Sequence, residues 1–523
     1  HTSSFSGVNS GFQVEHNSGN ITANFHAHSD HFETSENRNC LRALHQTDPR
    51  LDKRRIQKAK GGLLKEAYRW VFQNAEFQRW RYEEESQLLW VKGDPGKGKT
   101  MLLCGIIDEL TKSSLSSGTT VIFFFCQAAD ARINHATGVL RGLISMLVDR
   151  HPSLTSHVRR EYDRGGIDVF GDENAWYALL RIFTNILRDP LLRATYLIID
   201  ALDECTTGLN NLLDFIVEES ALHPHVKWLV SSRNWPSIEQ TLESATRKER
   251  LWLELNQASV SEAVGFYIHK QVDALTKKQK YSDEIRDAVL QHLLTNAHGT
   301  FLWVALICEE LAKFDVPRMA FRRKLQEFPA GLDQLYQRML NQIGDIEYSE
   351  LCKAILGIIT IVYRPITLDE LVVYIELPRD VQFSDLDEII GLCGSFLTLR
   401  GSTVSLVHQS AKDFLLRNAV DQILPRGEEV VHYEIFSKSL YAMANTLQRD
   451  TYDLSHPRYL IDQVKQPEPD PWAAVGYACF YWVDHLEMCS NQFCANISDD
   501  YAKGGAIMRS LAITTFIGLK PSA

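Results

Sequence analysis

The stretch LLWVKGDPGKGKT, residues 88–100, decides the fold, because it joins an apolar strand to a glycine-rich loop that ends in Lys-Thr. The loop matches the pattern G-x-x-x-x-G-K-[ST], and the apolar segment TMLLCGIIDEL follows it as a predicted helix. In this context Lys99 neutralises the β- and γ-phosphate oxygens of a nucleotide, Thr100 reaches Mg²⁺, and the loop N–H groups face the phosphates. The candidate nucleotide-binding residues are Gly93, Asp94, Pro95, Gly96, Lys97, Gly98, Lys99 and Thr100.

A second motif supplies the acidic half of such a site. The apolar strand in YLIIDALDEC ends in Asp200, a carboxylate placed to hold Mg²⁺, and Asp203 and Glu204 follow it. One of the latter two could orient or deprotonate an attacking water, whereas the alternative is that both cap the next helix. The next predicted strand, in VKWLVSSRNWP, ends at Arg233, which is either a sensor of the γ-phosphate or an ordinary surface arginine.

Short apolar segments alternate with longer amphipathic ones between residues 86 and 256. Near-continuous apolar strands that alternate with helices predict a parallel sheet covered on both faces. The predicted strands lie in QLLWVKG, TVIFFFC, TYLIIDALD, VKWLVSS and RLWLEL. The sequence therefore predicts an α/β fold, a P-loop NTPase sheet flanked by helices.

The segments around this sheet differ in pattern. Thr367 and Glu370 form a predicted capping box in RPITLDELVVYI, and FLTLRGSTVSLVH predicts a hairpin that turns at 400–402. Helices followed by a hairpin predict a winged helix. The expected units are a signalling segment at 1–35, a helical linker at 36–85 interrupted at Gly61-Gly62, the nucleotide-binding domain at 86–256, a helical domain at 257–345, the winged helix at 346–425, and a second helical region at 426–523 with a divergent end.

The composition argues against several classes of protein. The chain carries 55 Lys+Arg and 66 Asp+Glu, a net charge of −11, which disfavours a general nucleic-acid binder. The apolar run at 354–363 is too short to span a bilayer, and no signal peptide opens the chain, so we expect a cytoplasmic protein. The ten cysteines include no C-x-x-C pair, so we expect them to be reduced and buried.

Several classes of P-loop protein fit the remaining features less well. The Asn-Lys-x-Asp tetrapeptide with which GTPases read guanine is absent, and small-molecule kinases of this loop type are usually one compact domain. A winged helix could bind DNA, but the net charge of −11 and the acidic segment LDELVVYIELPRD favour packing against protein or nucleotide. A work-producing ATPase remains open.

Taken in order, these motifs resemble the NACHT class of STAND nucleotide switches, and most closely the fungal NOD-like receptors related to heterokaryon-incompatibility proteins. The resemblance covers about residues 38–485 and includes VSSR, GTFLWVAL and VHQSAKDFLL. It implies an ATPase in which ADP locks a closed monomer, whereas ATP promotes assembly into an oligomer. Cofactors implied are ATP/ADP and Mg²⁺.

The resemblance also implies a role for each candidate residue. Lys99 and Thr100 would hold phosphate and Mg²⁺, Asp200 the metal, Asp203 and Glu204 would serve hydrolysis, and Arg233 would sense the γ-phosphate. His408 aligns with the winged-helix histidine that contacts the β-phosphate of ADP and clamps the closed state. Without the resemblance, His408 would be taken for a satisfied core histidine.

The sequence departs from the family in three places. The nucleotide-contacting Gly-x-Pro of the family reads Gly299-Thr300-Phe301, and the sensor repeats expected after residue 490 are absent. The tail AKGGAIMRSLAITTFIGLKPSA no longer resembles the family. On its composition, the N-terminal GVNSGFQVEHNSGNITANF is either a disordered tail or a pair of short strands that stack between chains as a cross-β ladder. The resemblance implies the second, an Asn/Gly-rich segment that templates amyloid in a downstream effector protein. We expect a slow ATPase switch that self-assembles; the alternatives are a constitutive P-loop ATPase and a sensor-less scaffold.

Overall fold

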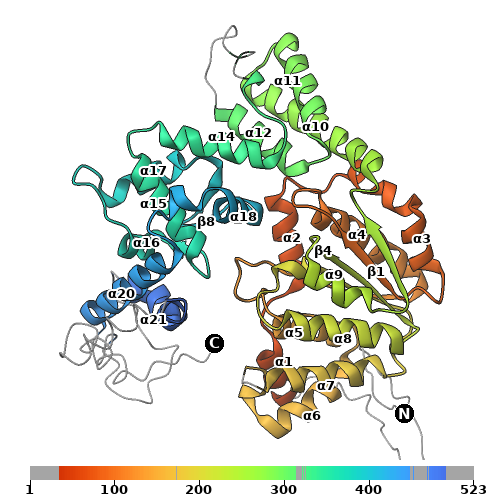
Figure 1. The fold of residues 1–523 in the computed structure, drawn as a ribbon. Helices are drawn as coiled ribbons and strands as arrows, with labels where there is room; N and C mark the ends of the chain where they lie inside the picture. The colour runs from red at the N-terminus through yellow and green to blue at the C-terminus, as the bar shows by residue number, and fades with distance from the viewer. Residues whose placement is uncertain are drawn as a thin grey trace, which may run out of the picture.

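A five-stranded parallel sheet forms the centre of the N-terminal half of the protein (Figure 1). In this computed structural model the described residues are 35–171, 174–313, 325–447 and 470–489, together with residues 321, 323, 452 and 468. The strands are β1 (Leu88–Lys92), β2 (Thr120–Phe125), β3 (Thr195–Asp200), β4 (Val226–Ser232) and β5 (Lys248–Trp252). All five predicted strands and the predicted α/β fold are therefore confirmed.

The strands lie in the order β2-β3-β4-β1-β5, and every neighbouring pair is parallel. Because β4 lies between β1 and β3, the loop after β1 and the acids after β3 flank the end of β4. The register pairs Lys92 with Ser232, the last residues of β1 and β4. Asp200, the last residue of β3, pairs with Phe125 of β2. The carboxyl ends of β1, β3 and β4 thus meet at one edge.

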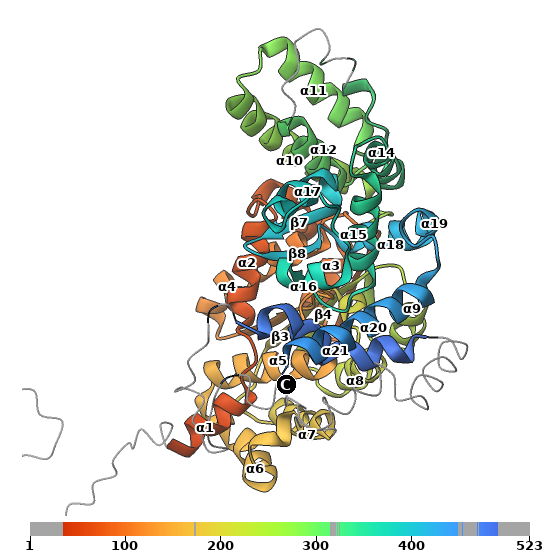
Figure 2. The same cartoon turned by 90° about the vertical axis from the view of Figure 1, so that its left-hand side faces the viewer.

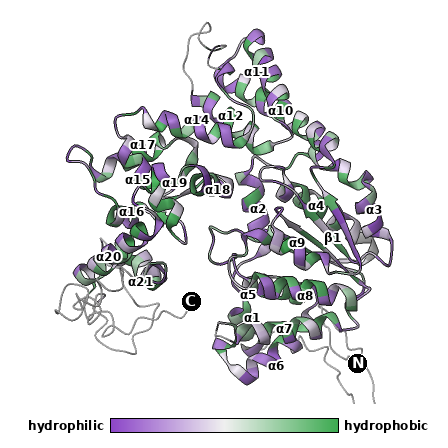
Figure 3. Cartoon of the chain, viewed as in Figure 1, coloured by the Kyte–Doolittle hydropathy of each residue, from purple (hydrophilic) through white to green (hydrophobic). Residues whose placement is uncertain are grey.

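Helices cover the sheet, and strands β1 to β4 are largely buried and apolar, with β1 buried at every position. The edge strand β5 buries only Leu251. These helices carry both hydrophobic and hydrophilic residues, as amphipathic covering helices do (Figure 3). They are α3 (Ala75–Tyr82), α4 (Lys99–Ser117), α5 (Ala136–Arg150), α6 (Thr155–Gly165), α7 (Ala175–Leu187), α8 (Leu209–Leu222) and α9 (Pro236–Glu243).

The first two described helices belong to the core of the sheet. They are α1 (Ser35–Leu44) and α2 (Pro49–Ala59), and Cys40, Leu44 and Ile56 are buried in the same hydrophobic cluster as the strands. The chain leaves α2 through Gly61 and Gly62, both with φ of +82°, a conformation that glycine adopts without a Cβ clash. The predicted interruption at these glycines is confirmed.

A second hydrophobic cluster holds the helices after the sheet together with the winged helix. The helical part contains α10 (Gln257–Gln279), α11 (Asp283–Asn296), α12 (Phe301–Lys313) and α14 (Leu332–Gly344). The elements that follow are α15 (Ser349–Ile361), β6 (Ile366–Thr367), α16 (Leu368–Tyr374), α17 (Leu386–Leu392), β7 (Leu397–Arg400), β8 (Thr403–Leu406), α18 (Gln409–Asn418) and α19 (Val420–Ile423). The last described helices are α20 (Glu428–Thr446) and α21 (Trp472–Glu487), which lie side by side (Figure 2).

Local predictions in this half agree with the structure. The capping box of Thr367 and Glu370 opens α16, and β7 and β8 form the predicted antiparallel hairpin. No described helix is long and apolar enough to cross a membrane. Seven of the described cysteines are buried, and no disulfide joins the described ones. The expected signalling segment, apart from Ser35, and the divergent end from residue 490 lie outside the described residues.

Candidate nucleotide-binding site

The glycine-rich loop joins the end of β1 to the start of α4. Gly98 precedes α4 with φ of +85°, and Gly96 has φ of +77°. The Lys99 ammonium donates to the carbonyl oxygen of Gly93 at 2.5 Å and to that of Asp94 at 3.1 Å. Burial lowers the pKa of Lys99, and the charges of Asp203 and Asp200 oppose this shift. The loop thus presents a buried cation next to the acids of β3.

Asp200 and Thr100 meet at the end of β3, as the motifs predict for two Mg²⁺ ligands. Ser231 Oγ donates to Asp200 Oδ1 at 2.6 Å and accepts from the N–H of Ala201 at 2.9 Å. Burial raises the pKa of Asp200, whereas hydrogen bonds from Ser231 and Thr100 lower it. The carboxylate and the hydroxyl are hard oxygen ligands of the kind that Mg²⁺ prefers.

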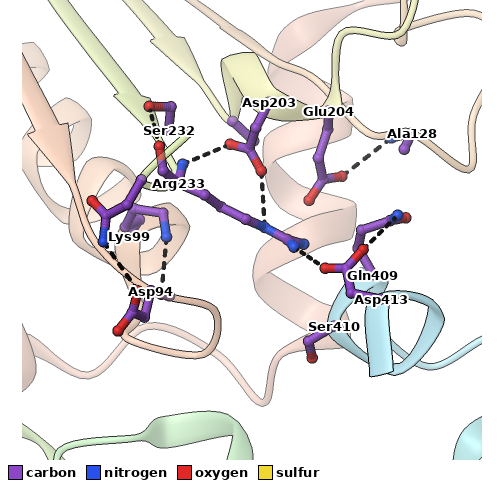
Figure 4. A network of polar contacts seen from close by, with 12 residues as sticks. Asp94, Lys99, Ala128, Asp203, Glu204, Ser232, Arg233, Gln409, Ser410 and Asp413 are labelled. Carbon is purple, nitrogen blue, oxygen red and sulfur yellow. Dashed lines mark hydrogen bonds and ion pairs between the residues drawn. The ribbon is translucent and has the colours of Figure 1, made fainter. Parts of the chain in front are cut away.

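Arg233 lies inside the protein at the end of β4 and is only 6% exposed, so it is not an ordinary surface arginine. Its backbone N–H donates to Asp203 Oδ1 at 3.0 Å, and its Nε pairs with Asp203 Oδ2 at 2.9 Å (Figure 4). Its Nη1 pairs with Asp413 of α18. Its Nη2 is buried and makes no hydrogen bond to the described residues. One nitrogen of the guanidinium is therefore left to bind a further acceptor.

Glu204 faces the same region from the turn after β3. One of its carboxylate oxygens accepts from the N–H of Ala128 at 3.1 Å (Figure 4). Burial, followed by the charge of Asp203, raises the pKa of Glu204 to about 7. The next helix, α8, begins after Gly208, so neither Asp203 nor Glu204 caps it. A carboxylate with a pKa near neutrality suits a general base.

His408 is brought to the site by the winged helix. It precedes α18, and its Nδ1 accepts from the N–H of Ser410 at 3.1 Å and lies 2.8 Å from Ser410 Oγ. Burial lowers the pKa of His408 well below its usual range, and the positive charges of Lys60, Arg233 and Lys99 add to the shift. The imidazole is therefore neutral at physiological pH.

A cavity of about 560 Å³ lies beside the loop and His408. Its lining includes the loop residues 96–98, residues of the segment after α2, and residues of α10 and α12. Lining residues that the motif analysis did not find include Lys60, Leu63, Tyr68, Tyr267 and Gln271. The sequence signals for this wall were the Gly61-Gly62 pair and the segment GTFLWVAL, which contains Phe301. The volume and the apolar walls suit a nucleoside.

The segment that replaces the family's Gly-x-Pro packs directly on the loop. The N–H of Leu302 donates to the carbonyl oxygen of Gly96 at 3.4 Å, and Lys97 Nζ donates to that of His298 at 2.8 Å. The Phe301 side chain lies over Gly98, where an added Cβ would be 2.8 Å from Phe301 Cδ2. These contacts hold the start of α12 against the loop. The helical part therefore contacts the phosphate end of the site without a proline.

One loop residue, Asp94, is held by two groups that the motifs did not indicate. The N–H of Asp94 donates to Glu254 Oε1 at 2.7 Å, and Asn234 Nδ2 donates to Asp94 Oδ1 at 3.0 Å. Glu254 and Asn234 lie just past the ends of β5 and β4. Polar residues at strand ends were the available signal, but only the strand order shows that these two reach the loop.

The predicted site residues thus gather at one edge of the sheet. Lys97 differs from the others because its ammonium donates to the carbonyl oxygen of His298.

Known proteins resemble this chain over most of its length. The vegetative incompatibility protein HET-E-1 of Podospora anserina is 53% identical over 461 residues, which is 86% of this chain. The chain belongs to the heterokaryon-incompatibility-related NACHT group of fungi. It spans 34% of the length of that relative. The family models for Nephrocystin 3, N-terminal, and for the GPI inositol-deacylase winged helix domain match residues 66–233 and 337–423 of this NACHT protein.

Solved structures resemble the chain more distantly. A Walker-type ATPase of Pyrococcus abyssi has a TM-score of 0.30 at 11% identity, covering 64% of this chain and 95% of its own. The RuvB Holliday junction branch migration motor of Thermotoga maritima has a TM-score of 0.26 at 16% identity, covering 66% and 93%. Neither score is high enough to establish a common fold.

Proposed function

We propose that this NACHT protein is an ATP/ADP-dependent switch that holds ADP in a closed state, exchanges it for ATP with Mg²⁺, hydrolyses ATP slowly and oligomerises when activated. The observation that carries the proposal is the composition of the cavity wall. The loop, the segment after α2, α10, α12 and His408 of the winged helix all line one cavity. A nucleotide bound there would touch several parts of the chain at once, so its loss or exchange would change how they pack.

The residues present fit a nucleotide with Mg²⁺. Lys99 and the loop N–H groups would bind the phosphates, and Thr100 and Asp200 would hold the metal. The bound Mg²⁺ would supply positive charge to the β- and γ-phosphate oxygens. The buried, unpartnered Nη2 of Arg233 is a donor available for a terminal phosphate. In this proposal His408, neutral and close to the loop, contacts the nucleotide from the winged helix.

Hydrolysis in this proposal depends on the two acids after β3. Asp203 is paired with Arg233, so it serves to orient that guanidinium. Glu204 has no cation partner among its hydrogen bonds and a pKa raised to about 7, so it is the better general base for a water. Its carboxylate is half protonated near neutral pH, which is consistent with slow turnover. Slow hydrolysis would return the switch to the ADP state.

The N-terminal segment and the self-assembly of the chain belong to the same proposal. Assembly of several copies would raise the local concentration of the segments before α1, which would favour pairing with an effector protein. The similarity to a vegetative incompatibility protein supports a signalling role of this kind. The alternatives to a switch are an ATPase that turns over continuously and a scaffold that does not bind nucleotide.

The test is to identify the nucleotide that the purified protein carries. Protein prepared without added nucleotide is denatured, and the supernatant is separated by anion-exchange chromatography. We expect about one ADP per chain, lost in Lys99→Ala and released faster in His408→Ala. A control variant, Lys112→Ala, removes an exposed lysine of the same helix that pairs with Glu109 and should retain ADP. An empty site with fast turnover would indicate a constitutive ATPase, and no nucleotide binding would indicate a scaffold.

A further inference from the structure

Two carboxylates from different parts of the chain share the guanidinium of Arg233. Asp203 comes from the turn after β3 and pairs with Nε, whereas Asp413 comes from α18 of the winged helix and pairs with Nη1 (Figure 4). The side chains of Arg233 and Asp203 are 7% and 3% exposed, and that of Asp413 is 23% exposed. Asp413 is thus the more accessible of the two acids and the one that α18 can carry away.

The carboxylates on the guanidinium of Arg233 oppose a further anion there. One guanidinium charge already faces two carboxylate charges, and Glu204 lies on the same side of the sheet edge (Figure 4). The nearby cation Lys99 is held by the carbonyl oxygens of Gly93 and Asp94 in the loop. Because the group is buried, these charges are screened far less than they would be in water. A terminal phosphate that approached the free Nη2 would gain the guanidinium but would also be repelled by Asp413. A diphosphate, which ends one phosphate earlier, would not have to reach this position.

We propose that Asp413 makes the site prefer a nucleoside diphosphate to a triphosphate, because its negative charge sits on Nη1 of Arg233, next to the free Nη2 that a terminal phosphate would approach. This inference rests on the proposed function and names a specificity-determining residue of the same site. Binding of a triphosphate would require Asp413 to withdraw, and α18 would withdraw with it. Binding of a diphosphate would leave the pair of Arg233 and Asp413 intact.

The position of Asp413 on α18 links this preference to the rest of the winged helix. His408 precedes the same helix and lines the nucleotide cavity, and Gln409 Nε2 donates to Asp413 Oδ1 at 3.4 Å. The Tyr336 hydroxyl of α14 lies 2.9 Å from Ser410 Oγ, and this hydrogen bond holds the first turn of α18 against α14. The start of α18 and the residue before it therefore carry both the histidine that lines the cavity and the carboxylate that pairs with Arg233. By thermodynamic linkage, if a triphosphate displaces Asp413 and so favours release of α18, then release of α18 favours binding of the triphosphate by the same factor.

The experiment compares two dissociation constants in the full chain. ADP and a non-hydrolysable ATP analogue are each titrated with Mg²⁺ into nucleotide-stripped protein by calorimetry. For Asp413→Asn, which keeps the size and loses the charge, we expect the preference for the diphosphate to fall by roughly 5- to 150-fold, the range of typical coupling between sites. Asp413→Glu restores the charge and should return the ratio toward that of the unchanged protein. Asp421→Asn, an exposed position on α19, is the matched control and should leave the ratio unchanged.

The outcomes separate this inference from the proposed function. If the unchanged protein binds neither nucleotide, the proposed function fails. If it binds both and Asp413→Asn alters the two affinities equally, the assignment of Asp413 is overturned while the nucleotide site stands. Circular dichroism checks that each variant is folded, and Asp413→Ser, a smaller neutral replacement, gives the same comparison if Asp413→Asn does not fold. An unchanged ratio in either folded variant counts against the inference.

Discussion

The contact of Phe301 with the loop can be measured by adding one methyl group. Gly98→Ala places a Cβ 2.8 Å from two ring atoms of Phe301, Cδ2 and Cε2, and no other side chain lies within 3.5 Å of it. The φ of +85° at this position adds about 1–2 kcal/mol of strain for any L-residue, and overpacking adds roughly 1–3 kcal/mol. We therefore expect Gly98→Ala to destabilise the nucleotide-free protein by about 2–5 kcal/mol.

A second substitution separates the two contributions. Phe301→Ala removes the ring, so it should relieve the overpacking of Gly98→Ala but not the backbone strain. In the double variant the destabilisation should fall short of the sum of the single effects by roughly 1–3 kcal/mol, the overpacking term. Gly118→Ala is the control: Gly118 ends the same helix with φ of +67° and has nothing within 4 Å of its added Cβ. Its effect should be strain alone and should add to that of Phe301→Ala.

The assay is urea unfolding of the nucleotide-free variants, followed by tryptophan fluorescence and by circular dichroism. The two probes are needed because a chain of several units need not unfold in one step, and the free energies should be compared for the same transition. Additivity of Gly98→Ala and Phe301→Ala within about 0.5 kcal/mol would refute the reasoning. It would mean that α12 does not rest on the loop in solution.

Three further predictions concern the described residues. Burial raises the pKa of Glu204 to about 7 from an ordinary value of 4.5, so the rate of single-turnover ATP hydrolysis should rise with pH and be half-maximal near pH 7. In Glu204→Gln the rate should not depend on pH in this range. If the pH profile of that variant equals that of the unchanged protein, Glu204 is not the base. Burial, and then the charge of His432, lowers the pKa of His485 to about 3 from 6.5, so the stability it contributes is full above pH 6.5 and is lost as pH falls toward 3. Amide protection factors in α21, which correct for the intrinsic slowing of exchange in acid, should therefore fall as pH falls, and fall less in His485→Gln. Trp228→Ala in the centre of the sheet should cost about 3–5 kcal/mol, measured by urea unfolding, and a cost below about 1 kcal/mol would contradict its full burial.

Local pattern determined much of the fold and part of the site. The five strands, the loop and the capping box follow from apolar runs, glycine positions and side-chain spacing within a few residues, and all lie where the sequence places them. The acids after β3 were found the same way. Such features depend only on residues a few positions apart along the chain, so they can be predicted from the sequence without knowledge of the tertiary structure.

The tertiary structure decided which of these features meet. The position of β4 between β1 and β3 places Arg233 beside Asp203, and no local pattern encodes a strand order. The pair of Arg233 and Asp413 joins residues 180 positions apart, and the contact of Phe301 with Gly98 joins α12 to the loop. Each side chain alone fits a surface residue or a core residue equally well. Only the packing of separate units decides between them, because burial and charge pairing are properties of the folded chain rather than of any segment.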